Sequence, residues 1–565
     1  MSISKLNKLL KKQVDKPSQK KTYSPKQADK STYKDDEKPK RSFTCEQSSE
    51  YSDKTIVITN SYGQLTNFNK SDVEKIAEAL TYFDEEANQF KIGILRSLKY
   101  AFAAKRNRSV SKYMWSVIKK NGCDSLDEHI DKLQKTLKSL KYRIYVCLLN
   151  SRCYFPTGLL EMVQETIPGT SIVDLREPPS NPINLRWYKN PPEMRYYQKE
   201  MVDLGIQSER GVFEAAVGSG KTLTAAYLIK EISAKTLIVV PSTKLKDQIY
   251  TEMWRAFGKS KVQIVESSHI KKKSKLKDIR IMTVQTLASL QKQKELSKVT
   301  ADIDVLILDE FHHAGSVSYG NLLNEIENIY YRFGFTGTFT RNDSKLLDLW
   351  GFLSKRLYHY PAYKATEEGY LTEVDYFVYN LQGNAAQNYQ KEYAANYCLS
   401  KDKYNKVIYP EELLSWIRNL TTKVIPEDEQ VLILVDQKEK AGEVIHKFLL
   451  DFGIENTYIS GDNKSSETNE AIEAFNNKEI RVLVATGVLG EGIDLKSTQH
   501  LVLAGGGKSE IKLVQAIGRA VRLYPNKPKS FVYDCNFEGT KYLEKHTGIR
   551  QDIFANHFSG RIVHH

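Results

Sequence analysis

A glycine-rich loop between an apolar run and a helical pattern limits the folds open to this chain more than any other feature. The sequence reads "GVFEAA", then "AAVGSGKT" over Ala215 to Thr222, then "TLTAAYLIKEI". This order fits the phosphate-loop consensus except that Ala215 replaces the first Gly. A Gly-rich turn before an ordinary helix is the alternative, but a flanking strand and helix are the setting that the consensus requires. The pattern predicts an α/β domain that binds a nucleotide phosphate.

The loop residues have two predicted tasks. The glycines let backbone N–H groups approach a phosphate, and the N-terminus of the helix adds its dipole. We expect Lys221 to reach the β- and γ-phosphates and Thr222 to bind Mg²⁺. The predicted ATP contacts are Ala216, Val217, Gly218, Ser219, Gly220, Lys221 and Thr222.

The stretch "VLILDEFHH", Val305 to His313, places four potential metal ligands within five residues. Zinc sites usually separate their ligands, whereas Asp309–Glu310 and His312–His313 are direct neighbours, so convergence on one zinc ion is not expected. The apolar run predicts a buried parallel strand that brings the carboxylates to its C-terminal edge. Asp309 would then hold Mg²⁺, and Glu310 would orient and deprotonate an attacking water. Because side chains alternate along a strand, one histidine is left for another role, unless both are simply polar residues that end the strand.

The chain is basic and its cysteines are scattered. The 83 Lys and Arg against 69 Asp and Glu give a net charge of +14, which favours a polyanionic partner such as nucleic acid, although a basic protein can also be merely soluble. The six cysteines form no CxxC, so neither a zinc ribbon nor a disulfide framework is predicted. No apolar run approaches a membrane span, and the start lacks the apolar core of a signal peptide. We expect a protein of the cytoplasm, or of the host compartment that holds the DNA, without membrane contact.

The length of 565 residues predicts several domains. Residues 1–54 contain almost nothing that could be buried, which predicts a disordered basic tail. Alternating apolar residues and then helical periodicity predict a small α+β domain over 55–185, closed by the Pro-rich stretch "EPPSNPINLRWYKNPPE". Two series of Val- and Ile-rich strands with amphipathic helices between them predict two parallel-sheet α/β domains, over 186–368 and 369–541. We expect the remaining 542–565 to form a C-terminal tail.

Besides the phosphate loop, seven short motifs occur in order between about residues 190 and 540. They are "RYYQ" from Arg195, "VVPSTKLKDQ" from Val239, "TVQTL" from Thr283, "DEFHH" from Asp309, "TGT" from Thr336, "ATGVLGEGIDL" from Ala485 and "QAIGRAVR" from Gln515. The ordered set resembles the superfamily 2 helicases, and it is far more specific than any one of its motifs.

Longer stretches narrow the resemblance. "FPTGLLEMV", "GFTGTFTRNDSKLLDLWG" and "LVLAGGGKSEIKLVQAIGRAVR" look like the phage UvsW and XPB-like DNA helicases. DEAD-box RNA helicases carry DEAD where this chain has DEFH, and iron–sulfur helicases need four cysteines that the region between the phosphate loop and "DEFHH" lacks. The resemblance implies two RecA-like motor domains, behind a DNA-binding N-terminal domain, that use ATP and Mg²⁺ to act on DNA.

The resemblance also implies roles for residues outside the phosphate loop. Some would contact the adenine and the rest of the nucleotide cleft, namely Arg195, Gln198, Gly492 and Asp494. Gln515 would position the attacking water, and Arg519 and Arg522 would reach the γ-phosphate as arginine fingers from the second domain. An exposed surface ion pair is the alternative for Arg519.

Further family positions would connect nucleotide and DNA. Closure of the cleft would be transmitted by His312, Thr336 and Thr338. DNA phosphates would be held by hydroxyls and backbone amides that fix position without reading sequence. The implied DNA contacts of the motor domains are Pro241, Ser242, Thr243, Lys244, Thr283, Gln285 and Thr286.

A basic, aromatic stretch lies in the predicted N-terminal domain. Residues 91–120 carry nine Lys and Arg and no Asp or Glu, interleaved with Tyr100, Phe102, Tyr113 and Trp115. Its cations could neutralise phosphates while an exposed aromatic stacks on a base at a fork. An aromatic helical core with a solvated basic face is the equal alternative. The predicted DNA contacts here are Lys105, Arg106 and Arg108.

These features support one leading hypothesis and two alternatives. The first is an ATP-dependent DNA helicase or translocase that unwinds or remodels branched or duplex DNA, independently of sequence, in replication, recombination or repair. Replication or recombination proteins would be its protein partners. An RNA helicase is the second. An ATPase switch or motor subunit of a defence or restriction assembly, without strand separation, is the third.

Overall fold

The computed structural model describes residues 54–82, 94, 96–98, 100–102, 104–106, 110–139, 143–144, 147–149, 152–179, 182–271, 275–311, 326, 329–338, 346–401, 407–486, 495, 497–525 and 527–565. The predicted tail 1–54 therefore lies outside the described residues, except for Lys54. The chain divides into two compact units, one with Thr81–Ile144 and the other with Thr55–Leu80 and Tyr145–His565. Within the described residues, no helix is both long and apolar enough to cross a membrane.

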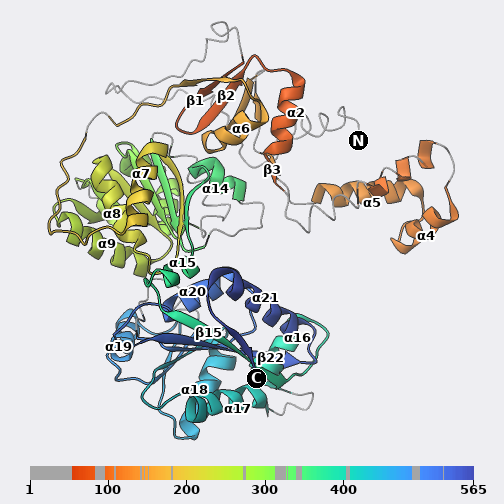
Figure 1. Cartoon of the computed structure of the whole chain (residues 1–565). Helices are drawn as coiled ribbons and strands as arrows, with labels where there is room; N and C mark the ends of the chain where they lie inside the picture. The colour runs from red at the N-terminus through yellow and green to blue at the C-terminus, as the bar shows by residue number, and fades with distance from the viewer. Residues whose placement is uncertain are drawn as a thin grey trace. The chain divides into compact units, whose positions relative to one another are not determined.

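The first parallel domain is built on a seven-stranded sheet in the order β10-β11-β9-β12-β13-β8-β14 (Figure 1). Its central strands are buried along their length, as expected where helices cover both faces of a parallel sheet. The strands are β8 Arg210–Ala215, β9 Thr236–Val240, β10 Val262–Ile264, β11 Ile279–Thr283, β12 Val305–Asp309, β13 Tyr331–Thr336 and β14 Arg356–Tyr360. The helices are α7 Tyr196–Ser208, α8 Lys221–Ile232, α9 Thr243–Phe257, α10 Ser267–Lys271, α11 Val284–Lys292, α12 Ser297–Thr300, α14 Leu346–Leu353 and α15 Ala362–Glu367.

The second parallel domain has a sheet of the same kind, in the order β19-β20-β18-β21-β22-β15-β23. Its strands are β15 Glu373–Gln382, β18 Val431–Val435, β19 Thr457–Ile459, β20 Val482–Thr486, β21 His500–Ala504, β22 Lys529–Glu538 and β23 Ile562–His564, with a hairpin of β16 Ser400–Lys401 and β17 Val407–Ile408 outside it. Its helices are α16 Tyr389–Tyr397, α17 Glu411–Asn419, η3 Leu420–Val424, η4 Lys438–Gly442, α18 Glu443–Asp451, α19 Ser465–Asn476, α20 Glu510–Ala520 and α21 Tyr542–His557.

The segment 542–565 is part of this second domain. The sequence predicts a C-terminal tail here, but the segment forms α21 and β23. Strand β23 pairs with β15 at the edge of the sheet. The side chains that α21 buries include His546, Thr547 and Arg550, which are polar. The helix therefore lacks the apolar stripe by which a packed helix is recognised in a sequence.

A five-stranded mixed sheet, in the order β5-β6-β2-β1-β7, precedes the parallel domains. The strands are β1 Thr55–Ile58, β2 Tyr62–Thr66, β5 Cys147–Leu149, β6 Arg152–Pro156 and β7 Ser171–Asp174, and the helices are α2 Lys70–Ala79, η1 Thr157–Leu159 and α6 Leu160–Thr166. The predicted fold class is confirmed: two parallel α/β domains follow a small α+β domain.

This mixed-sheet domain packs tightly on the first parallel domain through Gly158 of η1. A Cβ added to Gly158 would lie 2.0 Å from the carbonyl oxygen of Trp350 in α14, closer than any real contact. Around it, Lys355 forms an ion pair with Glu161, and the Arg332 guanidinium donates to the Ser61 hydroxyl at 3.3 Å. The "TGLL" stretch is thus an interdomain contact in which only glycine leaves enough room.

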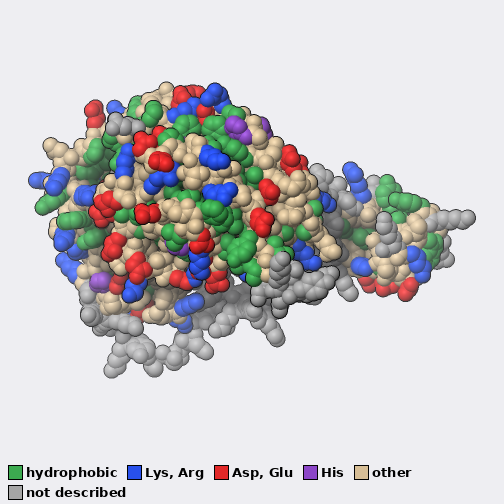
Figure 2. Space-filling view, turned by 90° about the horizontal axis from the view of Figure 1, so that it is seen from below, with side chains coloured by type: hydrophobic (Ala, Val, Ile, Leu, Met, Phe, Trp, Pro, Cys, Tyr) green, Lys and Arg blue, Asp and Glu red, His purple; other side chains and the backbone are tan. Residues whose placement is uncertain are grey.

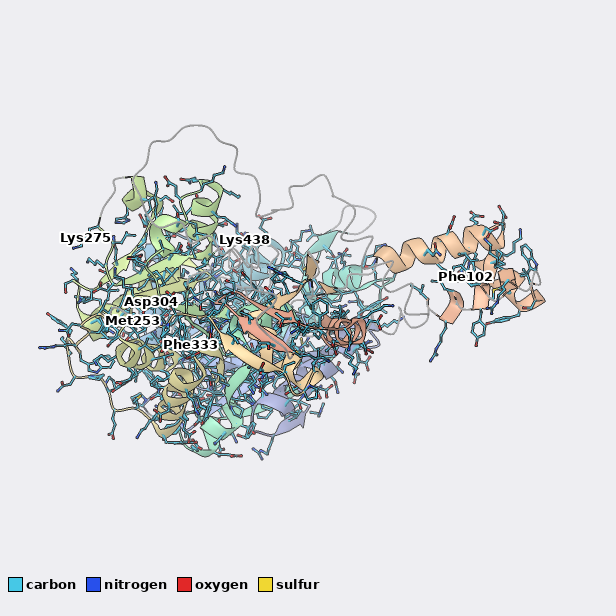
Figure 3. All side chains as sticks on the ribbon, turned by 90° about the horizontal axis from the view of Figure 1, so that it is seen from above. Phe102, Met253, Lys275, Asp304, Phe333 and Lys438 are labelled. Carbon is cyan, nitrogen blue, oxygen red and sulfur yellow. The ribbon has the colours of Figure 1, made fainter. Side chains whose placement is uncertain are left out.

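The remaining unit, which we call the helical unit, contains β3 Thr81–Tyr82, α4 Lys112–Lys120, α5 Leu126–Ser139 and β4 Arg143–Ile144. A small core of Ile94, Leu98, Ala101 and Ile130 holds it together, and Phe102 packs against that core (Figure 3). The chain enters the helical unit after α2 and leaves it before β5. The range 55–185, expected as one domain, is therefore shared between two compact units.

Candidate nucleotide site and nucleic-acid interface

The phosphate loop joins β8 to α8 as the sequence predicts. Gly218 and Gly220 adopt φ of +86° and +82°, which favours glycine, and Lys221 is the first residue of α8. The Lys221 ammonium donates to the carbonyl oxygen of Ala215 at 3.1 Å and lies 3.9 Å from a carboxylate oxygen of Glu310. This hydrogen bond joins the two ends of the loop, and the short distance to Glu310 places the lysine beside the "DEFHH" motif.

The order of the strands brings three motifs together. Because β13 lies between β8 and β12, the "TGT" segment at its end lies between the phosphate loop and the carboxylates. A Cβ added to Gly337 would lie 3.6 Å from the Lys221 Nζ. The Thr336 hydroxyl donates to the Thr338 carbonyl oxygen at 2.9 Å and accepts from its N–H at 3.3 Å, and both threonines are buried. Gly337, which lies between the predicted coupling residues Thr336 and Thr338, is thus beside the loop. Their role in coupling stays a prediction.

A small cavity beside this junction is lined by Lys221, Thr222 and Asp309 together with apolar side chains. The surface that lines this cavity is apolar, so the cavity itself is not an ion site. The Thr222 hydroxyl of the phosphate loop and the Asp309 carboxylate at the end of β12 are nevertheless oxygen ligands of the kind that Mg²⁺ prefers, with phosphates and water completing its shell. By their chemistry these two residues fit a Mg²⁺ ion. Glu310 follows at φ +46°, a conformation that non-glycine residues adopt rarely and that is most frequent at functional sites.

The "RYYQ" motif holds the phosphate loop from the other side. The Gln198 amide donates to the Ser219 carbonyl oxygen at 2.9 Å, and its oxygen accepts from the Arg195 N–H, also at 2.9 Å. The Tyr197 hydroxyl donates to the same Ser219 oxygen at 2.8 Å. The Arg195 guanidinium lies 4.2 Å from the centre of the Tyr370 ring. Contact of Arg195 and Gln198 with adenine stays a prediction, whereas their contact with the loop and its surroundings is direct.

Helix α20 of the second domain and the turn after it bring Gly518 and Arg522 close to the phosphate loop. Arg519 in α20 is only 7 % exposed and donates to the Gln515 carbonyl oxygen at 3.3 Å, so it is not an exposed surface arginine. A Cβ added to Gly518 would lie 2.7 Å from the Val217 Cβ. The Arg522 Cγ lies 3.7 Å from the position of a Cβ added to Gly218.

Three other predicted positions, His312, Gly492 and Asp494, lie outside the described residues.

The two predicted DNA motifs end neighbouring strands, β9 and β11. Ser242 accepts from the Leu245 N–H at 3.3 Å and Thr283 accepts from the Thr286 N–H at 3.2 Å, so each hydroxyl caps a helix. The Thr283 and Thr286 hydroxyls also lie 2.9 Å apart. Two helix N-termini at one sheet edge form a favourable surface for phosphate.

Three further side chains of these motifs have different environments. Gln285 donates to the Pro241 carbonyl oxygen at 3.1 Å, which ties the motifs together. Thr243 is exposed and open to a ligand. The Lys244 Nζ, in contrast, is buried without a hydrogen-bond partner among the described residues, and burial lowers its pKa. Lys244 therefore does not present a solvated charge as a surface phosphate contact would.

Three of the aromatic residues that the structure describes in the helical unit are exposed. Tyr100 is 67 % exposed, Tyr113 78 % and Trp115 41 %, so an aromatic core explains only Phe102. Lys105 forms an ion pair with Asp127, Arg106 is exposed, and Arg108 lies outside the described residues. On the face shown in Figure 2, Lys and Arg side chains are interspersed with Asp and Glu, so that face carries no continuous basic patch.

Two family models match the parallel domains. The model described as "Type III restriction enzyme, res subunit" matches residues 191–341, and "Helicase conserved C-terminal domain" matches residues 413–524. The chain has the motor domains of a superfamily 2 helicase. These two domains, together with the helicase relatives given below, make it an ATP-hydrolysing helicase.

Relatives and solved structures agree with this assignment. The chain is 27 % identical over 416 residues to "Putative helicase 22" of Sulfolobus islandicus filamentous virus (isolate Iceland/Hveragerdi), covering 68 % of this chain and 71 % of that one. It is 26 % identical over 360 residues to "ATP-dependent DNA helicase uvsW" of Enterobacteria phage T4, covering 60 % and 68 %. The structure of the "ATP-dependent Type ISP restriction-modification enzyme LlaBIII bound to DNA" matches with a TM-score of 0.50 at 15 % identity, over 67 % of this chain and 32 % of that chain, which shows the fold alone.

Some helicase residues at this site were not singled out from the sequence. Tyr197, within "RYYQ", donates a hydrogen bond to the phosphate loop, and its place in that motif was the only feature of the sequence that pointed to this role. Tyr370 lies under Arg195 but is 175 residues away in sequence, so no local pattern could link them. Gly518 approaches Val217, itself a predicted ATP contact, only because the two motor domains pack together.

Proposed function

We propose that this helicase is an ATP-dependent DNA helicase or translocase that unwinds or remodels branched or duplex DNA in replication, recombination or repair. The observation that carries the proposal is the meeting of Lys221, Glu310 and "TGT" at one sheet edge, with Arg522 of the second domain beside the loop. DNA is favoured over RNA by the phage relative, which is named as a DNA helicase. The mixed-sheet domain and the helical unit would select the branched substrate.

The hydrolytic step follows from the arrangement of these side chains. Lys221 would bind the β- and γ-phosphate oxygens, and Thr222 and Asp309 would hold a Mg²⁺ ion, which would supply positive charge to neutralise the phosphates. Glu310 accepts a proton from water as the water oxygen bonds to the γ-phosphorus. The bond from that phosphorus to the β–γ bridging oxygen breaks, and ADP and phosphate are formed. Gln515 orients the water, and Arg519 and Arg522 stabilise the charge on the transferred group.

Coupling to DNA would follow from the same sheet edge. Gly337, between Thr336 and Thr338, lies beside the loop, and the DNA motifs cap the helices after β9 and β11. A change in the loop on hydrolysis is therefore transmitted along neighbouring strand ends to the helix N-termini that face DNA phosphates. Alternating closure and opening of the motor domains would move the protein along the strand.

The proposal is tested with a panel of nucleic acids. ATPase activity of the full chain is measured with forked DNA, duplex DNA, single-stranded DNA and RNA, followed by strand-displacement assays on the same substrates. We expect the strongest stimulation with forked DNA, together with strand displacement. Stimulation by RNA alone would support an RNA helicase, and stimulation by duplex DNA without displacement would support a translocase subunit.

Variants connect the panel to the site. Lys221→Ala and Glu310→Gln should abolish hydrolysis while DNA binding stays within a few-fold of wild type, because the DNA motifs lie on other loops. Lys199→Ala, an exposed lysine in α7, is the matched control and should behave as wild type. Normal hydrolysis in Lys221→Ala would end the proposal.

We also propose that the helical unit binds single-stranded DNA at a fork through its exposed aromatics. Base stacking on an aromatic contributes about 1–3 kcal/mol for each base. Tyr113→Ala should therefore weaken binding to forked DNA by at least about fivefold and leave duplex binding unchanged. Arg106→Ala should flatten the slope of log K against log salt by about 0.7 to 0.9, and Lys105→Ala by less, because Asp127 already pairs with Lys105. Equal losses on forked and duplex DNA would refute the stacking role.

A further inference from the structure

Lys527, a buried lysine outside the helicase motifs, connects the segments of the second domain that carry "ATGVLGEGIDL" and "QAIGRAVR". Lys527 follows α20 and is only 6 % exposed. Its ammonium donates to the Ala520 carbonyl oxygen at 2.8 Å and to the Thr498 carbonyl oxygen at 3.2 Å. Ala520 is the last residue of the helix that carries Arg519, and Thr498 lies three residues after the end of "ATGVLGEGIDL". One side chain thus joins the C-terminal ends of both motifs.

The same contacts shape the turn that holds Arg522. The Lys527 N–H donates to the Tyr524 carbonyl oxygen at 3.2 Å, which closes the turn after α20. The Ser530 hydroxyl also donates to the Ala520 oxygen, at 2.6 Å, and the Thr372 N–H donates to the Val521 oxygen at 2.8 Å. The Ala520 and Val521 carbonyl groups at the end of α20 are therefore engaged, and a cation at a helix C-terminus is favoured by the helix dipole.

Burial of this ammonium carries a cost that a surface lysine would avoid. Burial, and then the nearby charge of Arg522, lower the pKa of Lys527 to about 7. A buried charged group persists where hydrogen bonds compensate it, and here two backbone carbonyls of functional segments accept from the ammonium. A purely structural filler would be satisfied by an apolar side chain of the same length.

We infer that Lys527 is a positioning residue for ATP hydrolysis, which fixes the end of α20 so that Arg519 and Arg522 meet the γ-phosphate. The inference rests on the proposed role of these arginines. Because the phosphate loop belongs to the first motor domain, ATP binding does not depend on Lys527. Its loss should therefore affect the turnover number and spare the KM for ATP.

The test uses the full chain with saturating forked DNA. Lys527→Met keeps the length of the side chain and removes its donors, and Lys447→Met, an exposed lysine of α18, is the matched control. We expect kcat of Lys527→Met to fall at least tenfold with KM for ATP within threefold of wild type, and Lys447→Met to be unchanged. In a background where both Arg519 and Arg522 are replaced by Ala, measured by single turnover, Lys527→Met should cause less than a twofold further loss, since both residues that it positions are gone.

The outcomes separate this inference from the proposed function. Wild-type hydrolysis by Arg519→Ala and Arg522→Ala would overturn the proposed function itself. Severe loss in those variants with normal kcat in Lys527→Met would overturn only the role of Lys527. If Lys527→Met does not fold, Lys527→Gln, which keeps an amide donor, replaces it, with an expected fall in kcat of about three- to tenfold at unchanged KM. An unchanged kcat, or equal changes in kcat and KM, would overturn the inference.

Discussion

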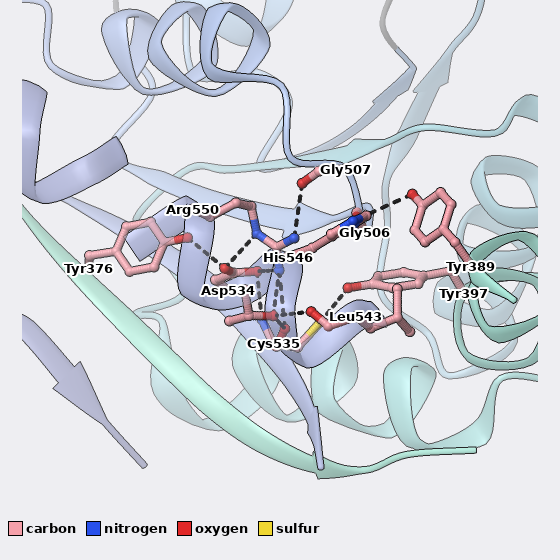
Figure 4. A network of polar contacts seen from close by, with 11 residues as sticks. Tyr376, Tyr389, Tyr397, Gly506, Gly507, Asp534, Cys535, Leu543, His546 and Arg550 are labelled. Atoms are coloured by element: carbon pink, nitrogen blue, oxygen red, sulfur yellow. Dashed lines mark hydrogen bonds and ion pairs between the residues drawn. The ribbon is translucent and has the colours of Figure 1, made fainter. Parts of the chain in front are cut away.

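Removing the Arg550 side chain should strongly destabilise the second motor domain. Its guanidinium donates two hydrogen bonds to Asp534, from Nε and Nη2, both at 2.8 Å (Figure 4). A third, from Nη1 to the Gly507 carbonyl oxygen at 3.0 Å, holds the loop that leads into α20. Arg550 is 3 % exposed and Asp534 is fully buried. Arg550→Met would therefore leave a buried carboxylate without its counter-ion.

The size of the expected loss of stability depends on the hydrogen bonds that Asp534 keeps. Breaking a buried pair by removing one partner costs about 3–5 kcal/mol. Asp534 would still accept from the Tyr376 hydroxyl at 2.5 Å and from the Cys535 N–H at 2.9 Å, which places the loss near the lower end. The lost bond to Gly507 adds about 1 kcal/mol. We expect the free energy of unfolding of this domain to fall by about 4 kcal/mol, a large part of the roughly 5–15 kcal/mol typical of a domain.

Hydrogen exchange of the amides in β22 measures this change within the second domain, because the full chain unfolds in more than one step. Arg550→Met should raise their exchange rates by about 10³-fold at pH 7 under conditions where exchange follows the opening equilibrium. The double variant Asp534→Leu with Arg550→Met removes both charges and should recover most of that loss. A change of less than tenfold in the single variant, or a double variant as unstable as the single one, would refute the reasoning.

Three further predictions follow from other contacts. Gly158→Val should destabilise the packing of the mixed-sheet domain on the first motor domain by at least about 2 kcal/mol, seen as faster proteolysis near 150–160, because the Trp350 backbone cannot yield. Thr336→Ala should retain DNA-stimulated ATPase activity but lose strand displacement, and equal loss of both activities would contradict a coupling role. Lys527→Met should stabilise the protein more at pH 7.5 than at pH 9.5. Since the folded pKa of Lys527, about 7, lies below its unfolded value near 10.5, wild-type stability gains up to about 1.4 kcal/mol per pH unit between them, and urea titrations of both proteins check the difference.

Parts of the fold that depend on local pattern were predictable, and parts that depend on distant partners were not. Apolar runs such as Val305 to Asp309 predict buried parallel strands because every residue of such a strand is covered. The helix α21 was missed because its buried Arg550 is satisfied by Asp534, which belongs to β22. The sequence does not separate the helical unit from its neighbours, because no local residue pattern marks where the chain leaves the mixed sheet and where it returns.

The sequence by itself determined the phosphate loop, its lysine and the Asp309–Glu310 pair, since each is set by a strand, a short loop and the residues next to it. Tertiary structure decided which of these groups meet. The position of β13 between β8 and β12 brings "TGT" to Lys221, and the packing of α20 brings Arg522 to Gly218. The hydrogen bond from Gln198 to Ser219 and those from Lys527 to Thr498 and Ala520 likewise join residues that are more than six positions apart in sequence. Such contacts depend on strand order and domain packing, which are properties of the whole chain and are not carried by any local stretch of residues.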